Sequence, residues 1–177
     1  NVMETFLAAG LPPSKIDDLK GLLRGDVVSS KHMLDFVPKV EGFEFQRLRE
    51  EIKGQKVTVI FDGTTRLGEA IAVLLRWCPS DFSGIQTRLV TMQTAEKHMD
   101  GAELCAFLVE VLTQACQVRV LDVVGGSRDS CSTNGTAMRN MKVVMIELLD
   151  FLCVSHTLSK LGEHIDLPTL HDFMTHW

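Results

Sequence analysis

The sequence predicts a mixed α/β domain preceded by a helical segment. Three short segments with β-type patterns follow one another between residues 57 and 94, and helical and strand-like patterns then alternate as far as residue 154. The composition agrees, because 45% apolar and 23% charged residues among 177 are typical of a globular protein with a core. We therefore expect a helical segment over residues 1–55 and an α/β domain over residues 56–177.

The first 55 residues have the pattern of several short helices. Apolar residues predict a helix at 3–9, and Ser14 is suited to cap a second helix in which apolar residues recur at helical spacing. A short helical turn is expected at 33–36, broken at Pro38, and a charged helix at about 42–53. Because it carries apolar helical faces, this segment is a candidate for self-association of the chain into a homo-oligomer.

Three strands are expected next, in a row. Residues 57–62 are rich in β-branched side chains, and residues 70–77 form a nearly continuous apolar run that Pro79 ends. Residues 85–94 alternate between polar and apolar side chains, as a half-exposed strand does. The short connections favour an antiparallel meander.

Helices and strands then alternate. The expected elements are a helix at 101–115, a strand at 118–124 ended by Gly125 and Gly126, a helix at 132–148, a strand at 151–154, and two helices near residue 158 and from about residue 168. The resulting order, β-β-β-α-β-α-β after a helical segment, is that of the ribonuclease-H-like fold.

The charge and the cysteines limit the class of protein. A net charge of −5 counts against autonomous DNA binding, which usually requires a basic face. No apolar run is long enough to span a bilayer, and no signal peptide opens the sequence, so no membrane association is expected. Five scattered cysteines without a CxxC pair predict free thiols in a reducing compartment.

Two aspartates stand where chemistry is expected. Asp62 ends the first predicted strand, and Asp129 lies between a strand and a helix; each alone is explained by a role in capping a turn or a helix. As a pair they predict more, since in a ribonuclease-H-like sheet the first strand pairs with the fourth. Carboxylates at matching levels of neighbouring strands repel unless a cation lies between them. Mg²⁺ or Mn²⁺ is the expected cation, which would activate water or a 3′-hydroxyl for in-line attack on a phosphate.

Three segments resemble those of a known family. Residues 60–65 (IFDGTT) resemble the strand that bears the first catalytic aspartate of hAT-superfamily transposases, and residues 128–138 (RDSCSTNGTAM) resemble the segment of the second. Residues 153–158 (CVSHTL) resemble the Cys-x-x-His segment of the same family. The resemblance covers about residues 5–177 and includes the helical segment.

This resemblance implies DNA transposition by two-metal phosphoryl transfer, with Asp62 and Asp129 as the catalytic and metal-binding residues. It also implies a structural or supporting role for Cys153 and His156, location in the nucleus, and a place for residues 1–55 close to DNA. The family's zinc finger, its large insertion and its third acid, a glutamate, have no counterpart in this sequence. We therefore expect a partial domain that does not cleave DNA by itself.

Basic residues near Asp129 are candidates for contact with a DNA phosphate. They are Arg128, Arg139 and Lys142, for which a solvated helix face is the alternative interpretation. Two other patterns give weaker evidence for a functional site. The spacing of Cys153 and the C-terminal histidines fits no common zinc finger, and nothing in the sequence places Cys131 beside His156 as a protease pair.

Two further interpretations remain open. The chain could be a domesticated protein-interaction or dimerisation module without catalysis, which associates through residues 1–55. It could also be an unrelated α/β binding domain, an interpretation that the acidic net charge supports.

Overall fold

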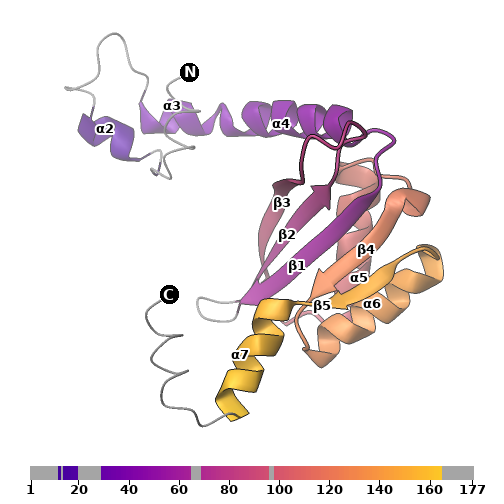
Figure 1. The fold of residues 1–177 in the computed structure, drawn as a ribbon. Helices are drawn as coiled ribbons and strands as arrows, with labels where there is room; N and C mark the ends of the chain where they lie inside the picture. Colours follow the sequence, from indigo (N-terminus) through magenta and orange to yellow (C-terminus); the bar gives the residue numbers. More distant parts are fainter. Residues whose placement is uncertain (1–11, 13, 20–28, 65–68, 96–97, 165–177) are drawn as a thin grey trace. The chain divides into compact units, whose positions relative to one another are not determined.

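The computed structural model describes residues 12, 14–19, 29–64, 69–95 and 98–164, and the chain divides into two compact units, residues 1–47 and 48–177 (Figure 1). The helices expected at 3–9 and from residue 168 lie outside the described residues. Among the residues described, no helix is long and apolar enough to cross a membrane.

The first unit contains two short helices and most of a longer one. They are α2 (Lys15–Leu19), α3 (Ser30–Leu34) and most of α4 (Val37–Ile52). The carboxylate of Asp17 accepts a hydrogen bond from the backbone N–H of Ser30, which ties α2 to the start of α3. Pro38 lies in the first turn of α4 rather than breaking a helix, because the N–H groups of a first turn have no helical partner anyway.

The second unit is built on a mixed sheet of five strands. In spatial order they are β3 (Gln86–Ala95), β2 (Glu69–Trp77), β1 (Val57–Thr64), β4 (Val123–Arg128) and β5 (Leu149–Leu152). The first three in sequence form the predicted antiparallel meander, and β4 and β5 run parallel to β1. The mixed α/β class is therefore confirmed.

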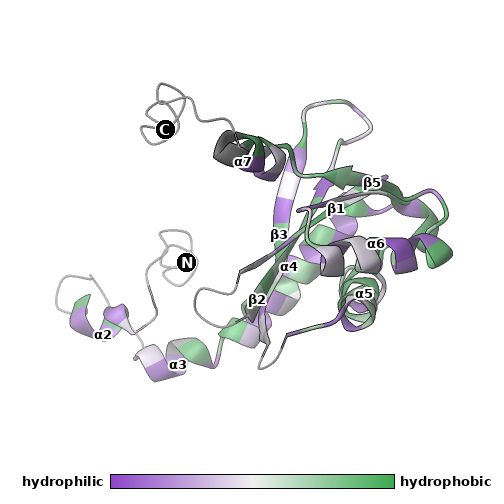
Figure 2. Cartoon of the chain, turned by 90° about the horizontal axis from the view of Figure 1, so that it is seen from below, coloured by the Kyte–Doolittle hydropathy of each residue, from purple (hydrophilic) through white to green (hydrophobic). Residues whose placement is uncertain are grey.

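Two helices, α5 (Gly101–Glu110) and α6 (Ser132–Val144), lie side by side on one face of the sheet (Figures 1 and 2). Residues of β1 alternate accordingly: Val57, Val59 and Phe61 are buried, whereas Asp62 is exposed. Helix α5 begins with a capping box between Asp100 and Glu103 and continues as one π-helical turn, η2 (Val111–Ala115), so the helix expected at 101–115 is present.

The predicted position of the fourth strand, residues 118–124, is wrong. A 3₁₀ turn, η3 (Val120–Asp122), occupies most of that segment, and β4 begins at Val123. Gly125 and Gly126 lie inside the strand instead of ending it. A Cβ on Gly126 would overlap with Cε of Met138, so the glycine allows α6 to pack closely on the sheet.

The elements that follow β4 are shorter than predicted or shifted. Helix α6 ends at Val144 because Met145 leaves the helical conformation, and the chain then turns into β5, two residues earlier than expected. The helix expected near residue 158 is present as α7 (Val154–His164). The backbone N–H of Cys153 donates to the carbonyl of Arg128, which holds the start of α7 next to the end of β4.

Candidate functional site

The two predicted aspartates lie at matching positions near the C-terminal ends of two neighbouring parallel strands. Ile60 of β1 pairs with Ser127 of β4, and Asp62 and Asp129 each lie two residues further along the chain. Adjacent strands are about 4.8 Å apart. The register thus brings the two aspartates to one edge of the sheet, as the sequence predicts, although β1 extends beyond Asp62 because β2 continues to pair with it as far as Thr64.

Asp129 is held by two neutral donors from the start of α6. Its Oδ1 accepts hydrogen bonds from the backbone N–H of Cys131 at 2.9 Å and from Nδ2 of Asn134 at 2.6 Å. The local capping role is therefore present. It uses one carboxylate oxygen only; in the part of the chain that the structure describes, Oδ2 has no hydrogen-bond partner.

Cys153 and His156 interact with each other and with the two aspartates. The pKa of His156 is raised, first by its hydrogen bond to Cys153 and then by the negative charges of Asp62 and Asp129. The pKa of the Cys153 thiol is lowered, first by the backbone N–H of His156 and then by its side chain. The imidazole thus lies within electrostatic reach of both aspartates, and four predicted site residues meet at this edge of the sheet.

None of the three predicted phosphate-contact residues forms an ion pair with the carboxylate of Asp62 or Asp129 among the described residues. Arg128, only 14% exposed in its side chain, donates two hydrogen bonds to the carboxylate of Asp150 and one to the carbonyl of Asp129. Arg139 and Lys142 are exposed on α6, and Arg139 donates to the hydroxyl of Thr136. Contact of these three residues with DNA stays a prediction.

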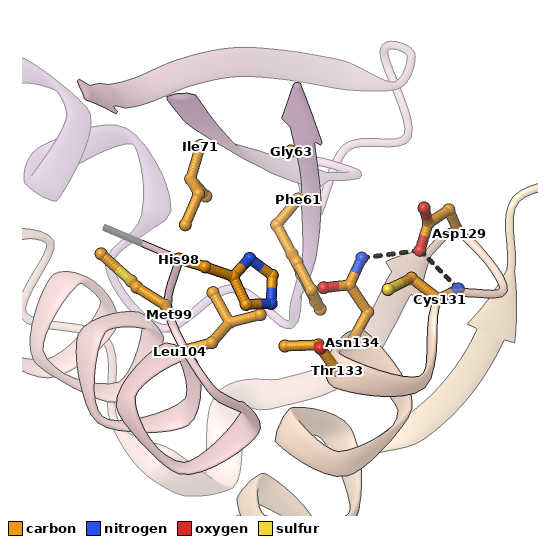
Figure 3. A pocket seen from close by; sticks show the side chains of 10 residues that line it. All are labelled: Phe61, Gly63, Ile71, His98, Met99, Leu104, Asp129, Cys131, Thr133 and Asn134. Carbon is orange, nitrogen blue, oxygen red and sulfur yellow. Dashed lines mark hydrogen bonds between the residues drawn. The ribbon is translucent and has the colours of Figure 1, made fainter. Parts of the chain in front are cut away.

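A pocket of about 210 Å³ opens beside Asp129 (Figure 3). Its walls come from the ends of β1 and β2, the loop before α5, α5 itself, and the turn that starts α6. The lining residues are Phe61, Gly63, Ile71, His98, Met99, Leu104, Asp129, Cys131, Thr133 and Asn134. The pocket is therefore mainly apolar, with polar groups on the side of Asp129, and Asp62 is not part of its lining.

No cluster of three or more histidine, cysteine, aspartate or glutamate side chains suited to hold a metal ion occurs among the described residues. Asp62 and Asp129 are two hard oxygen donors, which suits Mg²⁺ or Mn²⁺ with water as the remaining ligands and suits zinc poorly. Two carboxylates can hold such an ion only weakly.

Two residues of this region have roles that the sequence did not suggest. Asn134 orients Asp129, and Asp150 pairs with Arg128. Asp150 lies between the apolar Leu149 and Phe151 within a strand, and a charge in that position needs a partner, which is a signal that could have been used. Asn134 gives no comparable signal, because asparagine is ordinary near the start of a helix.

Exposed apolar side chains occur in the helical segment. They are Leu34, Phe36, Val37 and Phe43. Such residues are compatible with self-association, which stays a prediction here. No known protein-family model matches the chain, and no curated protein is significantly similar to it.

Proposed function

We propose that the chain is a hAT-transposase-derived protein with a ribonuclease-H-like core, which binds one Mg²⁺ or Mn²⁺ ion through Asp62 and Asp129 and, with it, a phosphate of DNA. One observation carries the proposal: two aspartates lie at matching positions near the C-terminal ends of neighbouring parallel strands. No lysine or arginine among the described residues forms an ion pair with either of them. A divalent cation would offset their mutual repulsion.

The residues present suit such an ion. Mg²⁺ is commonly bound by one or two carboxylates together with water and substrate phosphates. The two hydrogen bonds to Oδ1 of Asp129 fix the orientation of its carboxylate and leave Oδ2 for the cation. When bound, the ion would neutralise charge on a phosphate and lower the pKa of a water molecule.

His156 has a supporting role in this proposal. Its imidazole, whose pKa is raised, carries a positive charge more readily than an ordinary histidine and would offset part of the repulsion between Asp62 and Asp129 without a metal. Cys153 stabilises the protonated form through its hydrogen bond. The pair therefore tunes the cation affinity of the two carboxylates.

Cleavage is not proposed for the isolated chain. Two-metal phosphoryl transfer needs ligands for two ions, and the described residues supply only the pair Asp62 and Asp129. DNA transposition is the ancestral activity in this proposal, and binding of a cation and a phosphate is the property that the chain retains.

A thermal-unfolding titration with MnCl₂ tests the proposal. At a concentration of 100 times its Kd, Mn²⁺ should raise the Tm of the wild-type chain by about 5–10 °C. Asp62→Asn and Asp129→Asn should each abolish most of the increase, whereas Asp81→Asn, which changes an exposed loop carboxylate, should leave it unchanged. An equal increase in the double variant Asp62→Asn and Asp129→Asn would contradict the proposal.

A further inference from the structure

The pocket beside Asp129 is lined by a buried residue, Asn134, whose side-chain oxygen is open to the cavity. Asn134 is only 9% exposed, and its Nδ2 donates to Oδ1 of Asp129. This contact fixes the amide orientation, because a carboxylate accepts hydrogen bonds and does not donate them. The amide oxygen therefore points the other way, toward the cavity (Figure 3), and has no hydrogen-bond partner among the described residues.

The remaining walls suit an apolar group. Phe61, Ile71 and Leu104 form apolar walls, and the imidazole of His98 faces the cavity from its rim (Figure 3). A volume of about 210 Å³ is smaller than the 300–1,000 Å³ of most drug-sized sites, so the pocket suits one ring system rather than a whole nucleotide. Aromatic and apolar walls combined with one or two edge-directed hydrogen bonds are how enzymes hold an unstacked base.

Asp129 belongs to both sites. One of its oxygens anchors Asn134 at the pocket, and the other is available for the cation that would hold a phosphate. A base and its own phosphate are linked by one sugar, so a nucleotide could occupy both sites together. We propose that the pocket takes the unstacked base of the nucleotide whose phosphate the Asp62–Asp129 site holds, with an N–H of the base donating to Asn134. This inference rests on the function proposed above and names the part of the DNA that the site would recognise.

Gly63 allows the pocket to be filled without disturbing Asn134. It lies two residues after Phe61 on β1, on the same face of the strand, and lines the cavity. A Cβ added there would meet only the carbonyl oxygen of Ala70, at 3.9 Å. The φ angle of Gly63 is not positive, so side chains are tolerated. Gly63→Ala would add one methyl group, and Gly63→Leu would fill the space that the base needs.

Nuclear magnetic resonance titration of the ¹⁵N-labelled chain, with Mg²⁺ present, would measure the binding of two probes. Deoxyadenosine 5′-phosphate should shift the side-chain amide of Asn134 and the ring of His98, and 2-deoxyribose 5-phosphate, which lacks the base, should shift neither. Gly63→Leu should weaken binding of deoxyadenosine 5′-phosphate by about tenfold or more, and Gly63→Ala by about twofold at most. Equal shifts by both probes, or unchanged affinity in Gly63→Leu, would overturn the inference.

Two further probes test the hydrogen bond and the source of the base. Purine deoxyriboside 5′-phosphate, which lacks the amino group, should bind more weakly than deoxyadenosine 5′-phosphate; equal affinity would exclude the contact with Asn134. A single-stranded deoxyadenosine hexamer should bind more tightly than the mononucleotide, and weaker binding of the hexamer would overturn the assignment to DNA.

The metal site can fail independently of the pocket. Gly63→Leu leaves the side chains of Asp62 and Asp129 in place, so its Mn²⁺-dependent increase in Tm should remain. If that increase is present while the base probes fail, only the base pocket is excluded. If the increase is absent from the wild-type chain, the cation site itself is excluded.

Discussion

The two ends of the β1–β4 strand pair carry carboxylates in opposite electrostatic settings. At the start, Asp122 precedes β4 and is only 5% exposed; Arg119 donates two hydrogen bonds to it, and Nζ of Lys56, just before β1, lies 3.5 Å from its Oδ1. At the far end, Asp62 and Asp129 lie at the same level of the two strands, and only neutral groups donate to the carboxylate of Asp129.

This difference separates a structural carboxylate from a candidate binding site. A charge that the protein neutralises with lysine or arginine gains little from an added ion, whereas two like charges without a lysine or arginine partner favour one. Arg128 adjoins Asp129 in sequence, yet its guanidinium pairs with Asp150. The guanidinium of Arg128 therefore reaches only the backbone carbonyl of Asp129 and forms its ion pair with Asp150 instead.

Asp122→Asn should give the largest change in stability. The carboxylate of Asp122 is buried, but the side chains of Arg119 and Lys56 are exposed, so solvent screens part of the interaction that is lost. The free energy of unfolding at pH 7 should fall by about 1–1.5 kcal/mol. Asp62→Asn should change it by no more than about 0.5 kcal/mol, since an exposed, repulsive charge is removed. Urea unfolding measures both, and an equal loss in the two variants would contradict the distinction.

The comparison of the two ends also predicts how the stability contributed by Asp122 depends on pH. The pKa of Asp122 is lowered in the folded chain, first by the hydrogen bond from Arg119, so the unfolded chain binds the proton more readily. The stabilisation of the folded chain by Asp122 is therefore complete above the pKa of about 3.9 that aspartate has in the unfolded chain. It is lost as the pH falls through the lower pKa of Asp122 in the folded chain. The difference between wild type and Asp122→Asn should be constant from pH 5 to 8 and decrease below about pH 4.

The pKa of His156 should report on the charges of Asp62 and Asp129 at the far end of the strand pair. The expected change is smaller than the change in stability for Asp122→Asn. The pKa of His156 lies above 6.5, and Cys153→Ser should lower it most, followed by Asp62→Asn and then Asp129→Asn, in the order of their contributions. Mg²⁺ should lower it in the wild type, because a bound cation opposes the two negative charges. Histidine resonances followed against pH measure this, with Asp81→Asn as a control; a pKa unaffected by either aspartate would separate His156 from the site.

The sequence predicted the pairing at the far end for a physical reason. Residues 57–61 are β-branched or apolar, and a helix between the third and fourth strands allows the fourth to lie parallel to the first. Asp62 and Asp129 then follow from their positions at the ends of these strands. Cys153 and His156 lie three residues apart across the start of α7, so their contact is local and was also accessible from the sequence.

What could not be predicted depends on contacts between distant residues. The start of β4 was misplaced because the turn before it is fixed by Asp122 with Arg119 and Lys56, and Lys56 is far away in sequence. The sequence predicts that Gly125 and Gly126 end a strand, because it does not show that other elements occupy the space where their Cβ atoms would lie. The pocket has the same origin, since its lining comes from four separate segments.

Crystals grown or soaked with MnCl₂ test the central claim most directly, through the anomalous scattering of manganese. The account predicts one strong peak between the carboxylates of Asp62 and Asp129, at a coordination distance from an oxygen of each. A peak at another acidic group, such as Asp122 or Asp150, with none between Asp62 and Asp129, would contradict it.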